Sequence, residues 1–379
     1  MKVLIVQAGV PYTRSEDTQN NNNFSHEMTL TKGILKLNSS KYINSTQTRD
    51  AIAAQEGIDV HYYYYTHRKS IFNLIKGTLA IRKIVKENKV AIVNLYWGGL
   101  SSLLASLFCP AVFVVTLLGS DLHGSYNRNG SKTLFGKVLS FFSQLTCYYA
   151  DGVIVMSEKM KNKVWKKNRH KVEVIPEGVD LTKFFLIEKQ SAREHLHWPL
   201  TDPIVLFFNN TSFVKNFPLA EAVFALVKVK IPTAKLMVVN NIPHRQTVWY
   251  YNAADALLLT SLHEGSNNSI KESLACGLPV VTTDSGDAVD RLKNVTPSFV
   301  SPDWSKERLA EKLVEILNGD NGKSNGPDVV TEVELTVCAA ATIAYYRRLA
   351  NDDTFSSESG SKSRPIMKGE KLYRKSELC

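Results

Sequence analysis

Short apolar runs of strand length alternate with helix-period stretches along most of the chain. The runs are nearly continuous in Val, Ile and Leu, which is typical of strands that are covered on both faces, as in parallel sheets. They fall at 3–6, 60–65, 91–96, 112–117 and 152–156 in the first half, and at 204–208, 234–239, 256–260 and 279–283 in the second. This alternation predicts an α/β protein with two doubly wound, Rossmann-like parallel-sheet domains in tandem.

Interruptions of the alternation predict where the domains begin and end. Residues 176–203 lack a strong core pattern and are interpreted as the linker. We expect an N-terminal domain over 1–183, a C-terminal domain over 184–335, and a final helix over 336–351 that could cross back to the first domain. Residues 12–28 predict a flexible insertion, and the Ser-, Lys- and Glu-rich residues 352–379 predict a disordered tail.

Two apolar segments require a choice between a core and a membrane role. Residues 100–118 are almost wholly apolar, but Pro110 interrupts them. They predict a short helix, a turn and a buried strand, with a transmembrane span as the less favoured alternative. Residues 71–89 predict an amphipathic helix with Phe72, Ile75, Leu79 and Ile84 among basic residues. It either packs on its sheet or contacts a membrane surface through its basic side.

The whole net charge of +10 lies in the first half of the chain. Residues 1–180 contain 23 Lys and Arg against 13 Asp and Glu, whereas the remainder contains 23 of each. A basic half is typical of a solvated face, or of a protein that binds an anionic membrane surface or nucleic acid. Since no nucleic-acid motif accompanies the charge, we expect no nucleic-acid partner and rank an anionic membrane surface above RNA or DNA.

The cysteines indicate the compartment. There are five, widely spaced and odd in number, which argues against a disulfide framework or a zinc site and for a reducing environment. We therefore expect a cytoplasmic protein, with a peripheral position at the inner face of the membrane as the alternative.

Residues 257–281 carry the most specific candidate chemistry. A buried strand ends near Thr260, a turn follows, and a helix starts at about Asn268. In open α/β sheets, ligands bind beyond the carboxyl ends of the strands, and the unbonded N–H groups of a helix start suit a phosphate or a sugar hydroxyl. The candidate ligand-binding residues of this turn are Gly265, where a ligand could approach the backbone closely, and Ser266, Asn267 and Asn268.

Two carboxylates accompany this turn. Glu264 projects from the turn and Glu272 from the helix, about two helical turns further on, so they could hold two different polyols, such as a sugar and a ribose. Each has a simpler alternative. Glu264 could be a solvated loop acid, and Glu272 could close a capping box over residues 269–272.

These residues resemble a known family. Glu264, seven further residues and Glu272, followed by Ala-Cys-Gly-Leu-Pro-Val-Val at 275–281, resemble the signature of the retaining glycosyltransferases of family 4. That family has the GT-B fold, in which two Rossmann-like domains flank a cleft. Further segments are similar to family stretches in the same order: 119–122, 151–158, 174–180, 215–219 and 250–255. Together they cover most of the chain.

The resemblance implies a role for each candidate residue. The carboxylate matching Glu264 faces the transferred sugar, the one matching Glu272 binds the ribose hydroxyls, and the lysine matching Lys215 neutralises the diphosphate leaving group. Asn210 stands where the family has Arg and could hydrogen-bond a phosphate. Asp121 is either catalytic or a structural cap of the segment that follows it.

The resemblance also implies the reaction and its partners. The donor is a nucleoside-diphosphate sugar, the acceptor is a glycan or a lipid-linked acceptor in polysaccharide, lipopolysaccharide or glycolipid assembly, and neither a cofactor nor a metal ion is needed. Two alternatives stay open. One is another GT-B enzyme, such as a nucleotide-sugar epimerase. The other is a non-catalytic relic that binds nucleotide sugar, suggested by Asn210 and by Leu118, which replaces the family's His.

Overall fold

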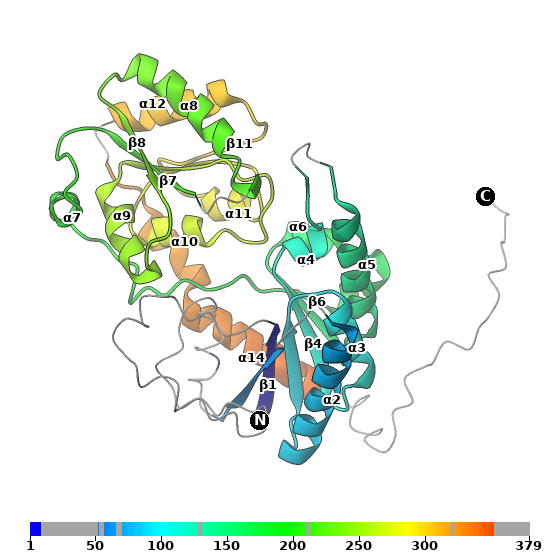
Figure 1. Ribbon diagram of the computed structural model, residues 1–379. Coiled ribbons are helices and arrows are strands. Elements are labelled where there is room, and N and C mark those ends of the chain that lie inside the picture. The colour runs from blue at the N-terminus through cyan, green and yellow to red at the C-terminus, as the bar shows by residue number, and fades with distance from the viewer. Residues whose placement is uncertain are drawn as a thin grey trace, which may run out of the picture.

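The computed structural model describes residues 1–8, 52, 57–65, 70–127, 131–209, 213–319 and 322–351. The insertion predicted over 12–28, the tail predicted over 352–379 and Asn210 lie outside these residues. Figure 1 shows two α/β domains that meet along one edge of each sheet. The two parallel-sheet α/β domains confirm the predicted fold class.

The N-domain is built on a six-stranded parallel sheet. The strand order is β2-β1-β3-β4-β5-β6, so β2 lies on one side of β1 and the later strands follow on the other side. Its central strands are almost completely buried, as their Val- and Ile-rich runs predict. The strands are β1 (Lys2–Ala8), β2 (Asp59–Tyr65), β3 (Ile92–Tyr96), β4 (Val112–Leu117), β5 (Gly152–Val155) and β6 (Val172–Val174).

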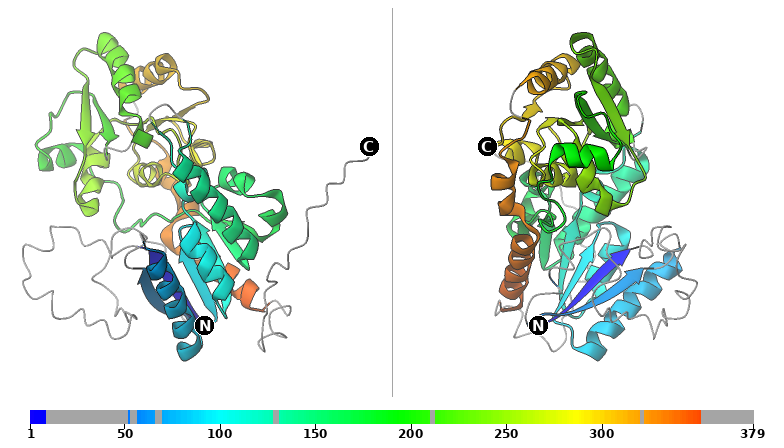
Figure 2. Two further views of the ribbon diagram at one scale, coloured as in Figure 1. Left: turned by 45° about the vertical axis from the view of Figure 1, so that its right-hand side comes forward. Right: turned by 90° about the vertical axis from the view of Figure 1, so that its left-hand side faces the viewer.

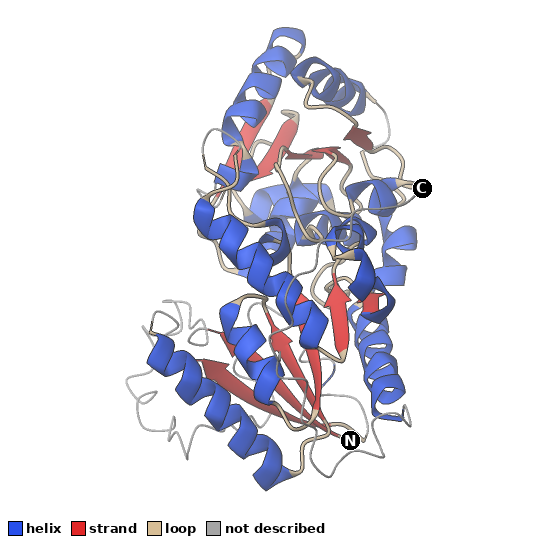
Figure 3. Cartoon of the chain, turned by 90° about the vertical axis from the view of Figure 1, so that its right-hand side faces the viewer, coloured by secondary structure: helices blue, strands red, loops and turns tan. Residues whose placement is uncertain are grey.

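One face of this sheet is covered by three neighbouring helices. They are α2 (Ile71–Asn88), α3 (Leu100–Phe108) and α5 (Leu134–Tyr149), with α3 in contact with both others. Figure 3 shows this layer facing the viewer. The apolar segment 100–118 thus forms α3, a turn at Pro110 and the buried strand β4, as predicted. In the described part of the chain, no helix is long and apolar enough to span a membrane.

Helix α2 packs through a different face from the one expected. Phe72, Ile75 and Leu79, which we assigned to its apolar face, are largely exposed, at 72%, 48% and 58%. Ile84 is buried as expected, and the packing face also contains Leu74, Thr78, Ile81 and Val85. The prediction for the first three was wrong because the helix carries more apolar residues than one packing stripe can bury, and pattern alone cannot choose among them.

Short elements at the carboxyl edge of the N-domain sheet face the second domain. They are α4 (Ser120–His123), which follows β4, and α6 (Glu158–Lys163), which follows β5. The 3₁₀ turn η1 (Lys166–Lys171) then leads into β6. Lys159 of α6 pairs with Asp284 of the second domain, so α6 contributes directly to the domain interface.

The C-domain is built on a five-stranded parallel sheet in the order β11-β10-β9-β7-β8. Its strands are β7 (Ile204–Phe208), β8 (Lys235–Val239), β9 (Ala256–Leu259), β10 (Val280–Thr283) and β11 (Phe299–Ser301). Its helices and 3₁₀ turns are α7 (Lys189–His195), η2 (Phe213–Lys215), α8 (Phe217–Lys230), η3 (His244–Gln246), α9 (Thr247–Ala253), α10 (Asn268–Ala275), α11 (Ala288–Leu292), α12 (Lys306–Asn318), α13 (Gly326–Val329) and η4 (Val330–Val333).

The last helix, α14 (Leu335–Asn351), returns to the N-domain. Figure 2 shows it running along that domain, far from the C-domain sheet. Its Tyr346 hydroxyl lies 2.5 Å from Nδ2 of Asn94 in β3. Its Tyr345 hydroxyl donates to the carbonyl of Lys171 at 2.6 Å and accepts from the Val153 N–H at 3.0 Å. The chain therefore crosses between the domains twice, and both crossings meet where Val179 pairs with Glu334.

Candidate functional site

The predicted turn and helix lie at the carboxyl edge of the C-domain sheet, facing the N-domain. Strand β9 ends at Leu259, and α10 begins at Asn268 after a turn. Asn267 is the N-cap residue, and its side-chain oxygen accepts from the Ser269 N–H at 3.0 Å. Asn268 is exposed at the helix start. Parallel strands and a helix N-terminus thus create the kind of edge at which open α/β sheets bind phosphorylated ligands.

Lys215 and Glu264 form an ion pair at this edge. The Lys215 Nζ lies 2.8 Å from Glu264 Oε1, and the two side chains are only 19% and 20% exposed. Lys215 ends η2, and the Thr260 hydroxyl donates to its carbonyl at 2.8 Å, which fixes the loop after β7 against the end of β9. The alternative that Glu264 is merely a solvated loop acid does not fit these contacts.

Glu272 is held by two side chains from the elements that precede β9. The Tyr251 hydroxyl of α9 donates to Glu272 Oε2 at 2.8 Å, and His244 Nε2 of η3 lies 2.8 Å from Oε1. Burial and the charge of Glu272 raise the pKa of Tyr251 well above its usual value, so the hydroxyl keeps its proton and remains a donor. The capping-box alternative for Glu272 is wrong, because the cap of α10 is Asn267.

Gly265 marks a close approach between the two domains. A Cβ on Gly265 would lie 2.2 Å from the carbonyl oxygen of Leu118 in the N-domain. The facing residue, Gly119, has a φ of +138°, a conformation that favours glycine, and its own Cβ would meet the Gly265 N atom at 3.1 Å. We expected the absence of a side chain at Gly265 to admit a ligand. In this structure the space is filled by the backbone of the opposite domain.

Ser266 belongs to a buried polar network behind the turn. Its hydroxyl donates to Asp287 Oδ2 at 2.7 Å and lies 3.1 Å from the Nζ of Lys271. Lys271 is fully buried and also donates to the carbonyl of Glu177 in the first interdomain crossing, at 2.5 Å. Burial lowers the pKa of Lys271, whereas Asp287 and Glu177 favour its charged form. The network ties the ligand-binding turn to the segment between the domains.

Asp121 lies on the N-domain side and is completely buried. Its Oδ1 accepts from the N–H groups of Gly119 (2.8 Å) and Leu122 (3.0 Å), and its Oδ2 from those of Gly98 (3.0 Å) and Leu118 (3.1 Å). Burial raises the pKa of Asp121, and these four bonds oppose that shift. The contacts fit the structural alternative, since the carboxylate shapes the loop that touches Gly265 and has no surface of its own for substrate.

The sequence did not predict the residues that orient the others. Tyr251 lies in a segment that resembles the family, but nothing there indicates its bond to Glu272, and His244 carries no motif. Lys271 looks like an ordinary surface lysine between two helix formers. His123 and His263, from opposite domains, stack with ring centroids 5.5 Å apart. Only three-dimensional proximity identifies these partners, since Tyr251 is 21 residues from Glu272, Lys271 is 94 from Glu177 and His123 is 140 from His263.

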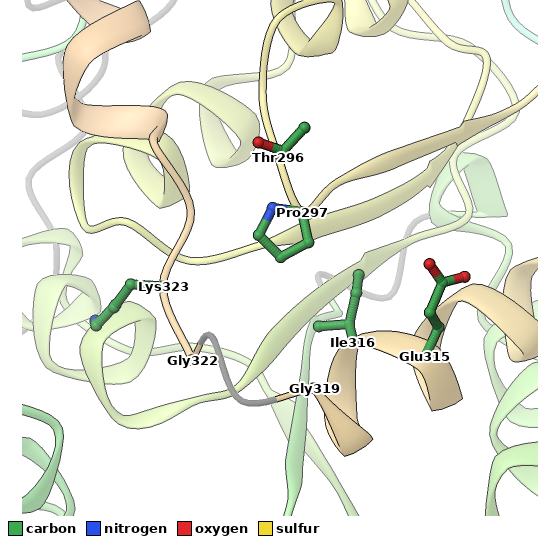
Figure 4. Close-up of a pocket in the computed structure, with 7 residues that line it drawn as sticks. All are labelled: Thr296, Pro297, Glu315, Ile316, Gly319, Gly322 and Lys323. Carbon is green, nitrogen blue, oxygen red and sulfur yellow. The ribbon is translucent and has the colours of Figure 1, made fainter.

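A second concave region lies elsewhere. This hollow has a volume of about 690 Å³. Figure 4 shows the residues that line it: Thr296, Pro297, Glu315, Ile316, Gly319, Gly322 and Lys323. Thr296 and Pro297 precede β11, so this hollow lies at the amino edge of the sheet, opposite the turn with Glu264. Ligands of open α/β sheets bind at the carboxyl edge, and the hollow is therefore not the candidate site.

Both halves of the chain are similar to known glycosyltransferases. The family model described as Glycosyltransferase Family 4 matches residues 42–183, and the one described as Glycosyl transferases group 1 matches residues 234–319, which include Glu264 and Glu272. TuaC of Bacillus subtilis, whose name assigns it to teichuronic acid biosynthesis as a glycosyltransferase, is 26% identical over 245 residues, 60% of each chain.

Two further proteins extend the likeness. CapM of Staphylococcus aureus, a capsular polysaccharide biosynthesis glycosyltransferase, is 22% identical over 217 residues, 48% of this chain and 57% of CapM. The structure of HepE from Anabaena in complex with UDP and glucose superposes with a TM-score of 0.57 at 16% identity, over 81% of this chain and 88% of HepE. The alignments with TuaC and CapM thus span less than two thirds of either relative.

The fold is that of the GT-B glycosyltransferases. Its two domains match glycosyltransferase family models in the expected order. These matches support a glycosyltransferase of the family 4 type.

Proposed function

We propose that this chain transfers a sugar from a nucleoside-diphosphate sugar to a glycan or lipid-linked acceptor, with retention of the anomeric configuration and without a metal ion. The carrying observation is that the Lys215–Glu264 ion pair lies at the turn leading into α10, the helix on which Tyr251 and His244 hold Glu272. The names of TuaC and CapM, which point to polysaccharide biosynthesis, and the UDP and glucose bound by HepE support this assignment.

The Lys215–Glu264 pair supports a division of labour in the transfer. A diphosphate leaves only if its growing negative charge is met by fixed cations and dipoles. Lys215 and the N–H groups at the start of α10 supply both at one edge. When the diphosphate takes the ammonium of Lys215, the carboxylate of Glu264 is released and can bind the hydroxyls of the transferred sugar.

Glu272 suits the ribose because it is already oriented. Tyr251 and His244 each hold one of its oxygens at 2.8 Å, and each oxygen can accept a further hydrogen bond from a ribose hydroxyl. An oriented carboxylate binds with less loss of side-chain freedom than a mobile one. Ribose does not react, so this contact serves binding more than turnover.

The test begins with identification of the donor. A thermal-shift screen over nucleoside-diphosphate sugars finds ligands that stabilise the folded chain. NMR of the sugar product made from the best donor should then show the donor's anomeric configuration, and EDTA should leave the rate nearly unchanged. An inverted product, or activity lost in EDTA and restored by magnesium or manganese, contradicts the proposal. A donor that binds but is never hydrolysed or transferred favours the non-catalytic alternative.

We also propose that the protein is cytoplasmic and docks on an anionic membrane through the outer face of the α2–α3–α5 layer. Helix α2 exposes Ile71, Phe72, Ile75 and Leu79, and α5 exposes Leu134, Phe135, Val138 and Phe141. Exposed lysines and arginines accompany them, including Lys76, Arg82, Lys83 and Lys137. Large apolar side chains flanked by cations suit the headgroup region of a bilayer. The four described cysteines are buried free thiols, which suits a reducing compartment.

A further inference from the structure

Basic side chains gather where the N-domain meets the turn after β9. They come from both domains and are called here the cationic cluster: His123, Lys132, Lys163 and His263. The Nζ of Lys163 lies 2.6 Å from Nδ1 of His123, whose ring stacks on that of His263. The ring of Tyr126 lies 4.9 Å from that of His263 and 6.0 Å from the Nζ of Lys132, and so joins the two ends of the cluster.

No acid offsets the lysines of this cluster. Within the described residues, no carboxylate forms an ion pair with Lys132 or Lys163. The two other lysines of α6 differ in this respect, since Lys159 pairs with Asp284 and Lys161 lies 3.9 Å from Glu158. Asp121 lies in α4 together with His123, but its carboxylate already accepts hydrogen bonds from four backbone N–H groups. The cluster is therefore a local excess of positive charge at the domain interface.

The pKa shifts of the cluster residues are consistent with this local excess of positive charge. Burial lowers the pKa of His123 to about 3, and Lys163, His263 and Lys132 act in the same direction. The pKa of Lys163 is lowered by burial, by Lys132 and by Lys159. Glu264 raises the pKa of His263, but burial and the lysines outweigh it. A bound anion would relieve this mutual repulsion.

Two buried nitrogens are left without a partner in the described structure. These are Nε2 of His123 and Nε2 of His263. His123 is 95% buried, so its uncompensated polar atom carries a cost that a ligand or a bound water would remove. Lys132 and Lys163 stand at the exposed rim. An anion bound by Lys132 and Lys163 at the rim therefore lies next to the imidazole rings of His123 and His263.

The position of the cluster assigns it to the acceptor rather than the donor. His263 immediately precedes Glu264, so the cluster adjoins the place of sugar transfer. The donor diphosphate already has Lys215 and the start of α10, both in the C-domain. Three members of the cluster belong to the N-domain, on the opposite side of the interface. The N-domain side can therefore hold a second anion, which the acceptor carries.

We propose that the cationic cluster binds an anionic group of the acceptor, a phosphate or a carboxylate. The inference rests on the proposed transfer at Glu264. It means that the acceptor is a charged saccharide or a phosphate-bearing carrier, and that a neutral sugar is a poor acceptor.

The test uses the full chain with its donor site saturated by the nucleoside diphosphate of the donor found in the thermal-shift screen, so that a free anion cannot enter the diphosphate site. Inorganic phosphate and D-glucuronate are titrated separately and monitored by calorimetry, with D-glucose as the neutral probe and ionic strength held constant. We expect at least one anion to bind and D-glucose not to. The double variant K132Q/K163Q should weaken the binding of that anion by roughly tenfold or more, because it removes two charged partners. The control K161Q, which lies on α6 with Lys163, should leave the anion affinity unchanged.

The two anions distinguish the two sources, since phosphate alone indicates a phosphate-bearing carrier and glucuronate alone a uronic acid. Equal anion affinity in the wild type and K132Q/K163Q overturns the inference, as does binding of neither anion by a protein that binds its nucleoside diphosphate. Failure of every nucleoside diphosphate to bind would instead contradict the proposed function. With an acceptor in hand, K132Q/K163Q should raise the acceptor KM and leave the donor KM unchanged, which a purely structural role would not do.

Discussion

The ammonium of Lys215 and the carboxylate of Glu264 lie 2.8 Å apart and form an ion pair. Both groups are needed elsewhere in the proposed reaction, one for the diphosphate and the other for the sugar. The donor must therefore exchange this ion pair for two contacts of its own. Such an exchange links the binding of the diphosphate to the release of Glu264. Substitutions of Lys215 and Glu264 therefore test the proposed catalytic roles.

We expect Lys215→Ala to lower kcat by roughly 10²- to 10³-fold, by analogy with the removal of one preorganised group that stabilises transition-state charge. Glu264→Gln should also lower kcat, because it loosens the sugar where the bond breaks. Steady-state kinetics with the identified donor measures both. Lys235→Ala removes a C-domain lysine that pairs with Asp202 at 2.7 Å and serves as the matched control. Turnover that survives both site substitutions would show that the donor site has been assigned wrongly.

The contacts of Glu272 predict the opposite kinetic pattern. Ribose is bound alike in the ground and transition states, so Glu272→Ala should mainly raise the donor KM. Tyr251→Phe keeps the ring but removes the hydroxyl that holds Glu272 Oε2. It should raise the same KM by about three- to tenfold, the value of a typical hydrogen bond. Tyr250→Phe is the neighbouring control. An unchanged KM together with a lower melting temperature would mean that Glu272 only stabilises the fold.

If the protein docks on membranes, it should sediment with anionic vesicles in preference to neutral ones. Added salt should weaken this binding. Replacing Arg82, Lys83, Lys86 and Lys89 with Gln should reduce binding, since each basic residue near the surface contributes about 1 kcal/mol. Ser in place of Phe72, Leu79, Leu134 and Phe135 should reduce it further. Val229→Ser changes a similarly exposed apolar residue, 76% exposed, on the C-domain helix α8 and should have no effect. Equal binding to both vesicle types would exclude this surface as the docking face.

The fold could largely be predicted because strands covered on both faces leave a strong apolar signal. All nine predicted strands are present in the structure. The sequence missed β6 and β11, each three residues long, because runs of this length do not stand out. The pattern also could not identify the packing face of α2. There, tertiary contacts with α3 and the sheet decide which of many apolar residues are buried.

The site could be predicted only as far as short motifs reach. Glu264, Glu272 and the start of α10 lie in one segment, so their local geometry follows from the sequence. The partners that set their charge and orientation come from elsewhere in the chain. Lys215 is 49 residues from Glu264, and Tyr251 and His244 belong to other elements. The role of Gly265 was misjudged for the same reason, since its neighbour is Leu118 of the other domain.

The cationic cluster makes folding stability depend on pH in a way that can be assigned to His123. Burial, Lys163, His263 and Lys132 lower the pKa of its imidazole to about 3 in the folded state, whereas an unfolded histidine titrates near about 6.5. Between these values the unfolded chain binds a proton that the folded chain does not. Stability is therefore fully present above the unfolded pKa and is lost as the pH falls, by up to about 1.4 kcal/mol per pH unit.

His123→Gln should remove this contribution. Urea unfolding of wild type and variant, compared from about pH 7.5 down to about pH 4.5, should show a stability difference that is constant above about pH 7 and shifts in favour of the variant as the pH falls. Lys163→Gln removes a repelling cation and should make the acid-induced loss shallower than in the wild type. His170→Gln changes an exposed histidine and should leave the wild-type slope unaltered. Parallel curves for the wild type and His123→Gln would mean that burial and the basic residues around His123 do not hold it neutral.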